Sequence, residues 1–223
     1  MTRPLPWAVV CDFDGTATTE DIGEQVVLRF ADEREYDRHE ALFAAGAIPF
    51  SGLLTRVFEG IEAGPEEVAA FAREVAVFRG GFERFVEACR DGGHPFVVCS
   101  AGLDAYIEPV LARLPAPLRG HVGVVANRAR FDARRLRVSF DEAAGDCGSC
   151  GTCKGNVVRA LQRAGHKVLL CGDGTSDRHG AEAADAVFAR EGGSLVRWCS
   201  ERAIPHVVFR TFDEVMARFP AWG

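Results

Sequence analysis

The chain has 223 residues, of which 48% are hydrophobic, and this suits one α/β domain with an inserted subdomain better than two full domains. Its formal net charge of −6 argues against a nucleic-acid binder, which needs a basic face, and no apolar run is long enough to cross a membrane. The first residues, 1–6, are polar and lead directly into an apolar strand, so no signal peptide is expected. Eight cysteines without a secretory signal indicate a reducing compartment, and we expect a cytoplasmic protein.

The first part of the chain predicts one buried strand and then a block of helices. Trp7 to Asp12 is an apolar run that ends in polar residues, which is typical of a buried strand. Helical segments are predicted at 18–31, with Thr18 or Thr19 as N-cap, and at 33–45, 51–62 and 65–77. This block has no strand pattern and interrupts the alternation of strands and helices. Residues 18–78 are therefore predicted to form an inserted, all-helical cap.

Strands and helices alternate again in the rest of the chain. Strands are predicted at 96–100, 121–126, 135–140, 167–171, 186–189 and 206–209, and the second and third of these are expected to pair. Helices are predicted at 82–91, 104–114 and 156–164, from Arg178 onward, and after each of the last two strands. A loop rich in Gly and Cys is expected at 141–153. This order predicts an α/β core, residues 1–17 and 79–223, with a Rossmann-like parallel sheet and helices on both faces.

Polar residues follow three of the predicted strands. Asp12 and Asp14 come directly after the first strand, Ser100 ends the second, and Asp173 and Asp177 follow a third. Because ligands bind at the carboxyl ends of strands in such a sheet, we expect the four aspartates to converge on one rim. Crowded carboxylates repel one another unless a cation lies among them, and their oxygens are hard ligands that suit Mg²⁺. The sequence therefore predicts a magnesium site at this rim.

The motifs resemble those of the haloacid dehalogenase superfamily, and the match covers nearly the whole chain. D-x-D-G-T from Asp12, a strand-end Ser100, a helix-start Lys154 and G-D-x-x-x-D ending at Asp177 occur in the order and spacing of that family. A second aspartate at Asp14 is common in its phosphatases and missing from the true dehalogenases. The resemblance therefore implies phosphate chemistry.

The resemblance also implies catalytic roles that agree with the residue types. Asp12 would attack phosphorus and form an aspartyl-phosphate, and Asp14 would protonate the leaving oxygen and later activate water. Asp12, Asp14 through its backbone carbonyl, Asp173 and Asp177 would bind Mg²⁺.

Substrate-binding residues are implied in the core and in the cap. Ser100, the N–H of Ala101 and Lys154 would hold the phosphoryl oxygens. Glu20 and Arg56 resemble cap residues of the phosphoserine phosphatase branch, in which the arginine binds a substrate carboxylate. From the residues alone, Glu20 is equally compatible with a first-turn acid favoured by the helix dipole, and Arg56 with a solvated helix face.

The loop before Lys154 resembles a different branch of the family. Ser176 stands where the phosphoserine branch usually has Asn, and Ala101 where it has Gly. Cys147, Cys150 and Cys153 resemble the Cys-rich loop of the methionine-salvage branch, the 2-hydroxy-3-keto-5-methylthiopentenyl-1-phosphate phosphatases. Their C-x2-C-x2-C spacing would allow a shared tetrahedral Zn²⁺ or a disulfide, and the alternative is a connector whose thiols have no role. The six histidines show no ligand spacing and are expected on the surface or in loops.

These observations predict a magnesium-dependent phosphomonoesterase that acts on a small phosphorylated metabolite. The cap would exclude macromolecules, so no nucleic-acid or membrane partner is expected, and the oligomeric state stays open. One alternative is a phosphotransferase that passes the phosphoryl group to an alcohol. Another is a metal- or redox-responsive binding protein built around the Cys loop.

Overall fold

A seven-stranded sheet forms the centre of the computed structural model, which describes residues 7–140 and 150–219. Its strand order is β4-β3-β2-β1-β5-β6-β7, and neighbours are parallel except for the antiparallel pair β3–β4. The strands are β1 (Ala8–Cys11), β2 (Phe96–Leu103), β3 (Val122–Asp132), β4 (Arg135–Ser139), β5 (Val168–Gly172), β6 (Ala186–Arg190) and β7 (Val207–Phe209). The predicted Rossmann-like sheet and the pairing of β3 with β4 are confirmed.

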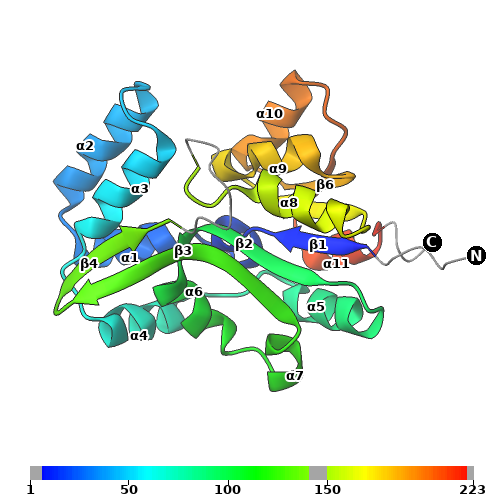
Figure 1. The fold of residues 1–223 in the computed structure, drawn as a ribbon, viewed down its shortest axis with the longest axis horizontal. Helices are drawn as coiled ribbons and strands as arrows, with labels where there is room; N and C mark the ends of the chain where they lie inside the picture. Colours follow the sequence, from blue (N-terminus) through cyan, green and yellow to red (C-terminus); the bar gives the residue numbers. More distant parts are fainter. Residues whose placement is uncertain (1–6, 141–149, 220–223) are drawn as a thin grey trace, which may run out of the picture.

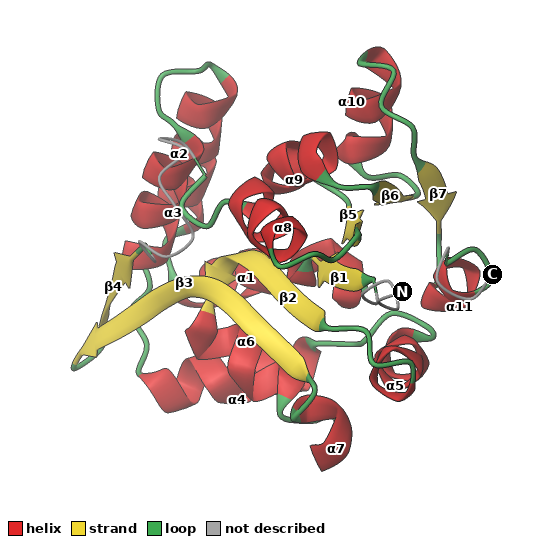
Figure 2. Ribbon diagram, turned by 45° about the vertical axis from the view of Figure 1, so that its right-hand side comes forward, coloured by secondary structure: helices red, strands yellow, loops and turns green. Residues whose placement is uncertain are grey.

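Helices cover both faces of this sheet (Figures 1 and 2). One face carries α8 (Lys154–Arg163), α9 (Arg178–Ala183) and α10 (Ser194–Glu201), and the other carries α5 (Phe82–Asp91), α6 (Asp104–Leu111), α7 (Ala116–Arg119) and α11 (Phe212–Met216). Successive side chains of β1 enter different cores, with Val9 and Cys11 packing in one and Ala8 and Val10 in the other. Because β1 is apolar on both faces, it occupies the middle of the sheet.

The helical insertion lies between β1 and β2 in the chain and consists of α1 (Ile22–Phe30), α2 (Glu33–Ala44), α3 (Phe50–Glu59) and α4 (Pro65–Val75). Helices α2 and α3 lie side by side at one end of the molecule (Figure 1), and α4 packs along α6. The β3–β4 hairpin also reaches these helices, since Arg137 pairs with Glu59 at 3.2 Å and Arg134 with Glu67 at 2.6 Å. Strand β3 is therefore longer than the predicted 121–126, and the hairpin that it forms with β4 contacts the inserted helices.

Two helices start two or more residues away from their predicted first residues. Helix α1 begins at Ile22, later than predicted, because the Thr18 hydroxyl donates to the carbonyls of Phe13 and Glu20 and does not cap a helix. Asp21 caps α1, accepting the Glu24 N–H at 2.8 Å. Helix α8 begins at Lys154, two residues earlier than predicted. Among the residues that the structure describes, no helix combines the length and apolar character needed to cross a membrane.

Candidate active site

The carboxyl ends of three adjacent strands meet at the centre of the sheet. β1 pairs with both β2 and β5, so Asp12 after β1, Ser100 in β2 and Asp173 after β5 come together. After Asp12 the chain makes a short helical turn, η1 (Phe13–Ala17), and a second turn, η3 (Thr175–Asp177), follows Asp173. The predicted convergence of residues distant in sequence thus follows from strand order.

A buried lysine joins two of the converging aspartates. The Nζ atom of Lys154 lies 2.7 Å from Asp12 Oδ1, 2.6 Å from Asp177 Oδ1 and 2.9 Å from Ser176 Oγ, and its side chain has no exposed surface. Burial works to lower the pKa of Lys154, but the charges of Asp12 and Asp177 prevail and raise it. Lys154 is therefore a permanent cation that orients the Asp12 carboxylate.

Three carboxylates form a group that could hold a cation. Oxygens of Asp12, Asp173 and Asp177 lie within 4.8 Å of one another. Burial is the main cause that raises the pKa of Asp12 and of Asp173, and the nearby charge of Asp177 adds to it. Gly15 has a φ of +68°, and a Cβ there would lie 2.8 Å from Asp173 Oδ2, so glycine permits this close approach. Crowded oxygen ligands of this kind fit Mg²⁺.

Asp177 also shapes the turn that carries Asp173. Its Oδ2 accepts the N–H groups of Asp173 at 2.9 Å and Gly174 at 2.8 Å. Arg190 Nη2 donates to the Asp173 side chain, at Oδ2, over 3.1 Å. Asp173 is thus held at its backbone N–H by Asp177 and at its carboxylate by Arg190, and Asp177 also contributes charge to the site.

Asp14 points away from these three carboxylates and toward the cap. Its Oδ1 accepts the N–H groups of Ile22 at 3.0 Å and Gly23 at 3.1 Å, and its Oδ2 accepts the Tyr106 hydroxyl at 2.7 Å. Burial raises the pKa of Asp14, and the Tyr106 hydrogen bond opposes this rise. Ser100 Oγ lies 3.4 Å from the same Oδ2. This carboxyl group is therefore separate from the cation site and suited to proton transfer.

Ser100 and Ala101 lie on the rim beside Asp14. The Ser100 Oγ accepts the Gly102 N–H at 2.9 Å, and the Ala101 carbonyl accepts a hydrogen bond from Asn127 at 2.6 Å. Both residues line the cavity above the carboxylates. Their fixed backbone makes this segment suitable for binding an anion.

Arg79 begins a segment, Arg79-Gly-Gly-Phe82, that fits both branches of the family that the motifs resemble, but no role was predicted for its side chain, which holds the turn after Asp12. Its guanidinium donates to the carbonyls of Gly15 at 2.8 Å, Thr16 at 2.8 Å and Thr18 at 3.1 Å. Arg190 and Tyr106 were missed in the same way. Their partners lie far away in the sequence, and no local pattern marks an arginine or a tyrosine for such contacts.

A cavity of about 460 Å³ lies between the rim and the cap. Its floor includes Asp12, Asp14 and Asp173. Its opposite wall, formed by the inserted helices, includes carboxylates before and on α1 and α2, at Glu20, Asp21, Glu24 and Glu40, and apolar side chains that are most frequent on α3, at Val27, Phe43, Phe50, Leu53, Leu54, Val57 and Phe58. The cavity therefore combines a charged floor with a roof that is apolar along α3 and acidic along α1 and α2.

The two predicted cap residues lie in different places. Glu20 lines the cavity. Arg56 is exposed, does not line the cavity, and donates from Nη1 to the Gly52 carbonyl of its own helix at 2.9 Å. The structure thus brings Glu20, but not Arg56, to the substrate cavity.

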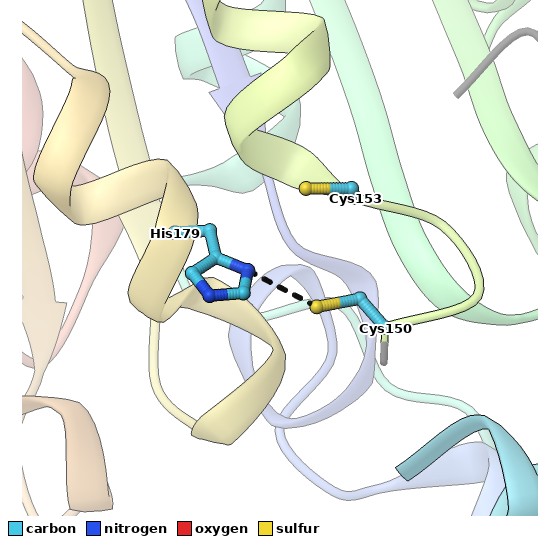
Figure 3. A group of neighbouring side chains, drawn as sticks. All are labelled: Cys150, Cys153 and His179. Carbon is cyan, nitrogen blue, oxygen red and sulfur yellow. Dashed lines mark hydrogen bonds between the residues drawn. The ribbon is translucent and has the colours of Figure 1, made fainter. Parts of the chain in front are cut away.

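The predicted Cys loop is described in part. Cys147 lies outside the described residues, whereas Cys150 and Cys153 are buried beside His179 of α9 (Figure 3). His179 was expected on the surface or in a loop and instead lies at this helix, partly buried.

Comparison with known proteins identifies the family. The family model described as haloacid dehalogenase-like hydrolase matches residues 9–182, which covers the D-x-D-G-T turn, Lys154 and the Asp173–Asp177 turn. The chain belongs to the haloacid dehalogenase-like hydrolases.

Relatives of this hydrolase are named as phosphatases. It is 31% identical to the 2-hydroxy-3-keto-5-methylthiopentenyl-1-phosphate phosphatase of Bacillus velezensis, over 96% of this chain and 89% of that protein. It is 30% identical to the bifunctional enzyme MtnB/MtnX of Bacillus licheniformis, over 96% of this chain, and spans 49% of that longer protein. A substrate-bound phosphoserine phosphatase shares its fold, with a TM-score of 0.74 and 17% identity over 96% of this chain and 99% of that one.

Proposed function

We propose that this hydrolase is a magnesium-dependent phosphomonoesterase of small metabolites, in which Asp12 is the nucleophile. The proposal rests on one observation: the site contains two carboxyl groups in different surroundings. Lys154 holds Asp12 by an ion pair, whereas Asp14 lies apart from the cation site and accepts a hydrogen bond from Tyr106. The names of the relatives support the hydrolysis of a phosphate ester and do not favour a phosphotransferase or a binding protein. The proposal includes a cytoplasmic location, because a chain with eight cysteines suits a reducing compartment.

The first half of the reaction transfers the phosphoryl group to the protein. An Asp12 oxygen attacks phosphorus, the bond from phosphorus to the ester oxygen breaks, and Asp14 gives its proton to the departing alkoxide. Lys154 beside Asp12, together with Ser100 and the Ala101 N–H, stabilises the charge on the phosphoryl oxygens.

The second half regenerates the free carboxylate. Asp14, now ionised, takes a proton from water, the water oxygen attacks phosphorus, and the bond to Asp12 breaks to release phosphate. Asp12, Asp173, Asp177 and the Asp14 backbone carbonyl would hold Mg²⁺. When bound, this ion supplies charge neutralisation for the nucleophile and the phosphoryl oxygens.

We also propose that residues 18–78 act as a cap that selects the substrate, over a core of 1–17 and 79–223. The apolar side chains that α3 places in the roof favour an apolar chain on the phosphate ester, as in the compound named for the Bacillus velezensis relative. Among the described residues that line the cavity, Arg190 is the only basic side chain, and Asp173 already pairs with it. A substrate carboxylate such as that of phosphoserine would find no cation in the roof, and Arg56 lies outside the cavity.

The test compares two phosphate esters in the presence of Mg²⁺. Phosphate release from 2-hydroxy-3-keto-5-methylthiopentenyl 1-phosphate should exceed that from phosphoserine in kcat/KM. Burying the two carbons and the sulfur of a methylthio chain contributes about 2.4 kcal/mol at roughly 0.8 per group, or about 60-fold. Equal values for the two esters, or faster turnover of phosphoserine, would contradict the assignment of the roof.

A matched pair of variants separates the roof from the chemistry. Leu54 lines the cavity and is 8% exposed, whereas Leu28 of the same cap is 44% exposed and does not line it. Leu54→Asn should reduce kcat/KM for the methylthio ester by about 10-fold or more and leave kcat for p-nitrophenyl phosphate nearly unchanged. Leu28→Asn should change neither.

A further inference from the structure

Beneath the rim, a second group of potential metal ligands lies apart from the aspartates. The ligand atoms of Cys150, Cys153 and His179 all lie within 4.8 Å of one another. Cys150 Sγ is 3.2 Å from His179 Nδ1, and Figure 3 shows the two sulfurs and this nitrogen gathered between the start of α8 and the start of α9. Cys150 is 8% exposed and Cys153 1% exposed. The two thiols are therefore shielded from solvent, and the group offers two sulfur atoms and one imidazole nitrogen as ligands.

These spacings agree with ligation of one tetrahedral ion. With Zn–S bonds of about 2.3 Å and a Zn–N bond of about 2.05 Å, tetrahedral geometry separates two sulfurs by about 3.8 Å and a sulfur from a nitrogen by about 3.6 Å. The observed Sγ–Nδ1 distance of 3.2 Å needs only a small outward shift to admit the ion. Thiolate and imidazole ligands select Zn²⁺ over Mg²⁺, which prefers oxygen.

The backbone around the thiols is held in place by contacts outside the group. Thr152 is buried between the two cysteines and donates to Asn127 Oδ1 at 2.8 Å, which fixes the segment to β3. Gly151 has a φ of +71°, and a Cβ there would lie 2.7 Å from the Phe140 ring. Such a conformation at such close range requires glycine. The two cysteines therefore lie on a turn whose conformation is fixed by contacts with neighbouring residues.

The histidine is brought to the thiols by a close approach of two helices. A Cβ at Gly155, in the first turn of α8, would lie 2.7 Å from the carbonyl oxygen of His179, so only glycine lets the helices pack this closely. His179 follows Asp177 by two residues, and Cys153 directly precedes Lys154. The group therefore connects the two segments that carry the Lys154–Asp177 ion pair.

We propose that Cys150, Cys153 and His179 are the ligands, among the described residues, of a Zn²⁺ site that connects the start of α8 to the start of α9. The site is distinct from the magnesium site and independent of the proposed phosphatase activity. The bound ion fixes the backbone just before Lys154 and just after Asp177, so it holds the lysine against the nucleophile without touching the substrate.

The test uses the full chain, saturated with Mg²⁺ and titrated with Co²⁺ as a spectroscopic probe for Zn²⁺. One equivalent of Co²⁺ should bind and produce the near-ultraviolet charge-transfer band of a thiolate ligand, and Zn²⁺ should displace it. Co²⁺ at the aspartate rim would give no such band, which separates the two sites. Removing one ligand should weaken Co²⁺ binding, so in Cys150→Ala and in His179→Gln one equivalent of Co²⁺ should give a much weaker band than in the parent chain.

Cys89→Ala is the matched control, because it removes an equally buried thiol from α5 on the opposite face of the sheet and should keep the band. His179 is only partly buried, so His179→Gln is a second variant that tests the site if a cysteine variant fails to fold. Circular dichroism checks the fold of each. Absence of the band in the parent chain, or an unchanged band in a folded His179→Gln variant, would overturn the proposal.

Discussion

The hydrogen bond from Tyr106 to Asp14 gives the sharpest test of the proton-transfer geometry. The Tyr106 hydroxyl donates to Asp14 Oδ2 at 2.7 Å, and the ring packs against Phe13 and Phe58 with centroid distances of 6.2 Å to each. Tyr106→Phe removes the donor and keeps the ring. Because the bond stabilises the ionised carboxylate, its loss should raise the pKa of Asp14 beyond the rise already caused by burial.

The size of the effect follows from the strength of a hydrogen bond to a charged group. Such a bond is worth about 1.5–3 kcal/mol, or about 1–2 pH units in the pKa of Asp14. Asp14 must be ionised to accept a proton from water in the second half-reaction. We therefore expect the acid limb of the kcat–pH profile to move upward by about 1–2 units, and kcat at any pH below this limb to fall about 10- to 100-fold.

The assay is steady-state phosphate release across pH with saturating Mg²⁺ and p-nitrophenyl phosphate. Tyr36→Phe is the control, because its hydroxyl donates to Glu24 at 3.0 Å and not to Asp14, so its kcat profile should match that of the parent. A Tyr106→Phe enzyme with kcat within twofold of the parent and an unshifted acid limb would refute the role assigned to this bond.

Four further predictions follow from the same geometry. Gly102→Ala should lower kcat to a similar degree as Tyr106→Phe, because its Cβ would lie 1.7 Å from the Tyr106 hydroxyl oxygen; parental kcat in a folded variant would contradict this. Asp12→Asn should abolish turnover by at least about 10³-fold with an unchanged circular dichroism spectrum, and near-normal kcat would exclude Asp12 as nucleophile. Chelation should remove activity and Mg²⁺ should restore it, whereas Ca²⁺ should inhibit; full activity after exhaustive chelation would contradict a cation among the aspartates. Arg56→Ala should change kcat/KM less than twofold for both phosphoserine and the methylthio ester, and a selective loss on phosphoserine would mean that Arg56 reaches the substrate.

The sequence was most informative where one strand pattern determined both fold and site. Apolar runs that end in polar residues predicted β1, β2 and β5 together with the positions of Asp12, Ser100 and Asp173, because the same strand ends that build the sheet deliver the side chains. The start of α1 was predicted too early, since Thr18 has the residue type of a helix cap but uses its hydroxyl to hold the turn after β1.

Contacts between distant segments could not be predicted in the same way. Tyr106 of α6 donates a hydrogen bond to Asp14, and Arg79, which follows the inserted helices in the chain, donates to the turn after Asp12. His179 of α9 contacts Cys150 of the loop before α8. Each contact depends on how finished elements pack, and none has a periodicity or spacing within the chain. The extension of β3 belongs to the same class, because its far end is stabilised by pairing with β4 and by ion pairs to the cap.

The most direct test of Asp12 as the nucleophile is detection of a phosphoryl group on this residue. The enzyme would be mixed with excess p-nitrophenyl phosphate and Mg²⁺, quenched in acid within milliseconds, digested and analysed by mass spectrometry. The proposed mechanism predicts a phosphorylated peptide with the modification at Asp12, more of it in Tyr106→Phe because water attack is slowed, and none in Asp12→Asn. Rapid turnover with no phosphorylated Asp12 in either the parent or Tyr106→Phe, or the phosphoryl group on another residue, would contradict the central claim.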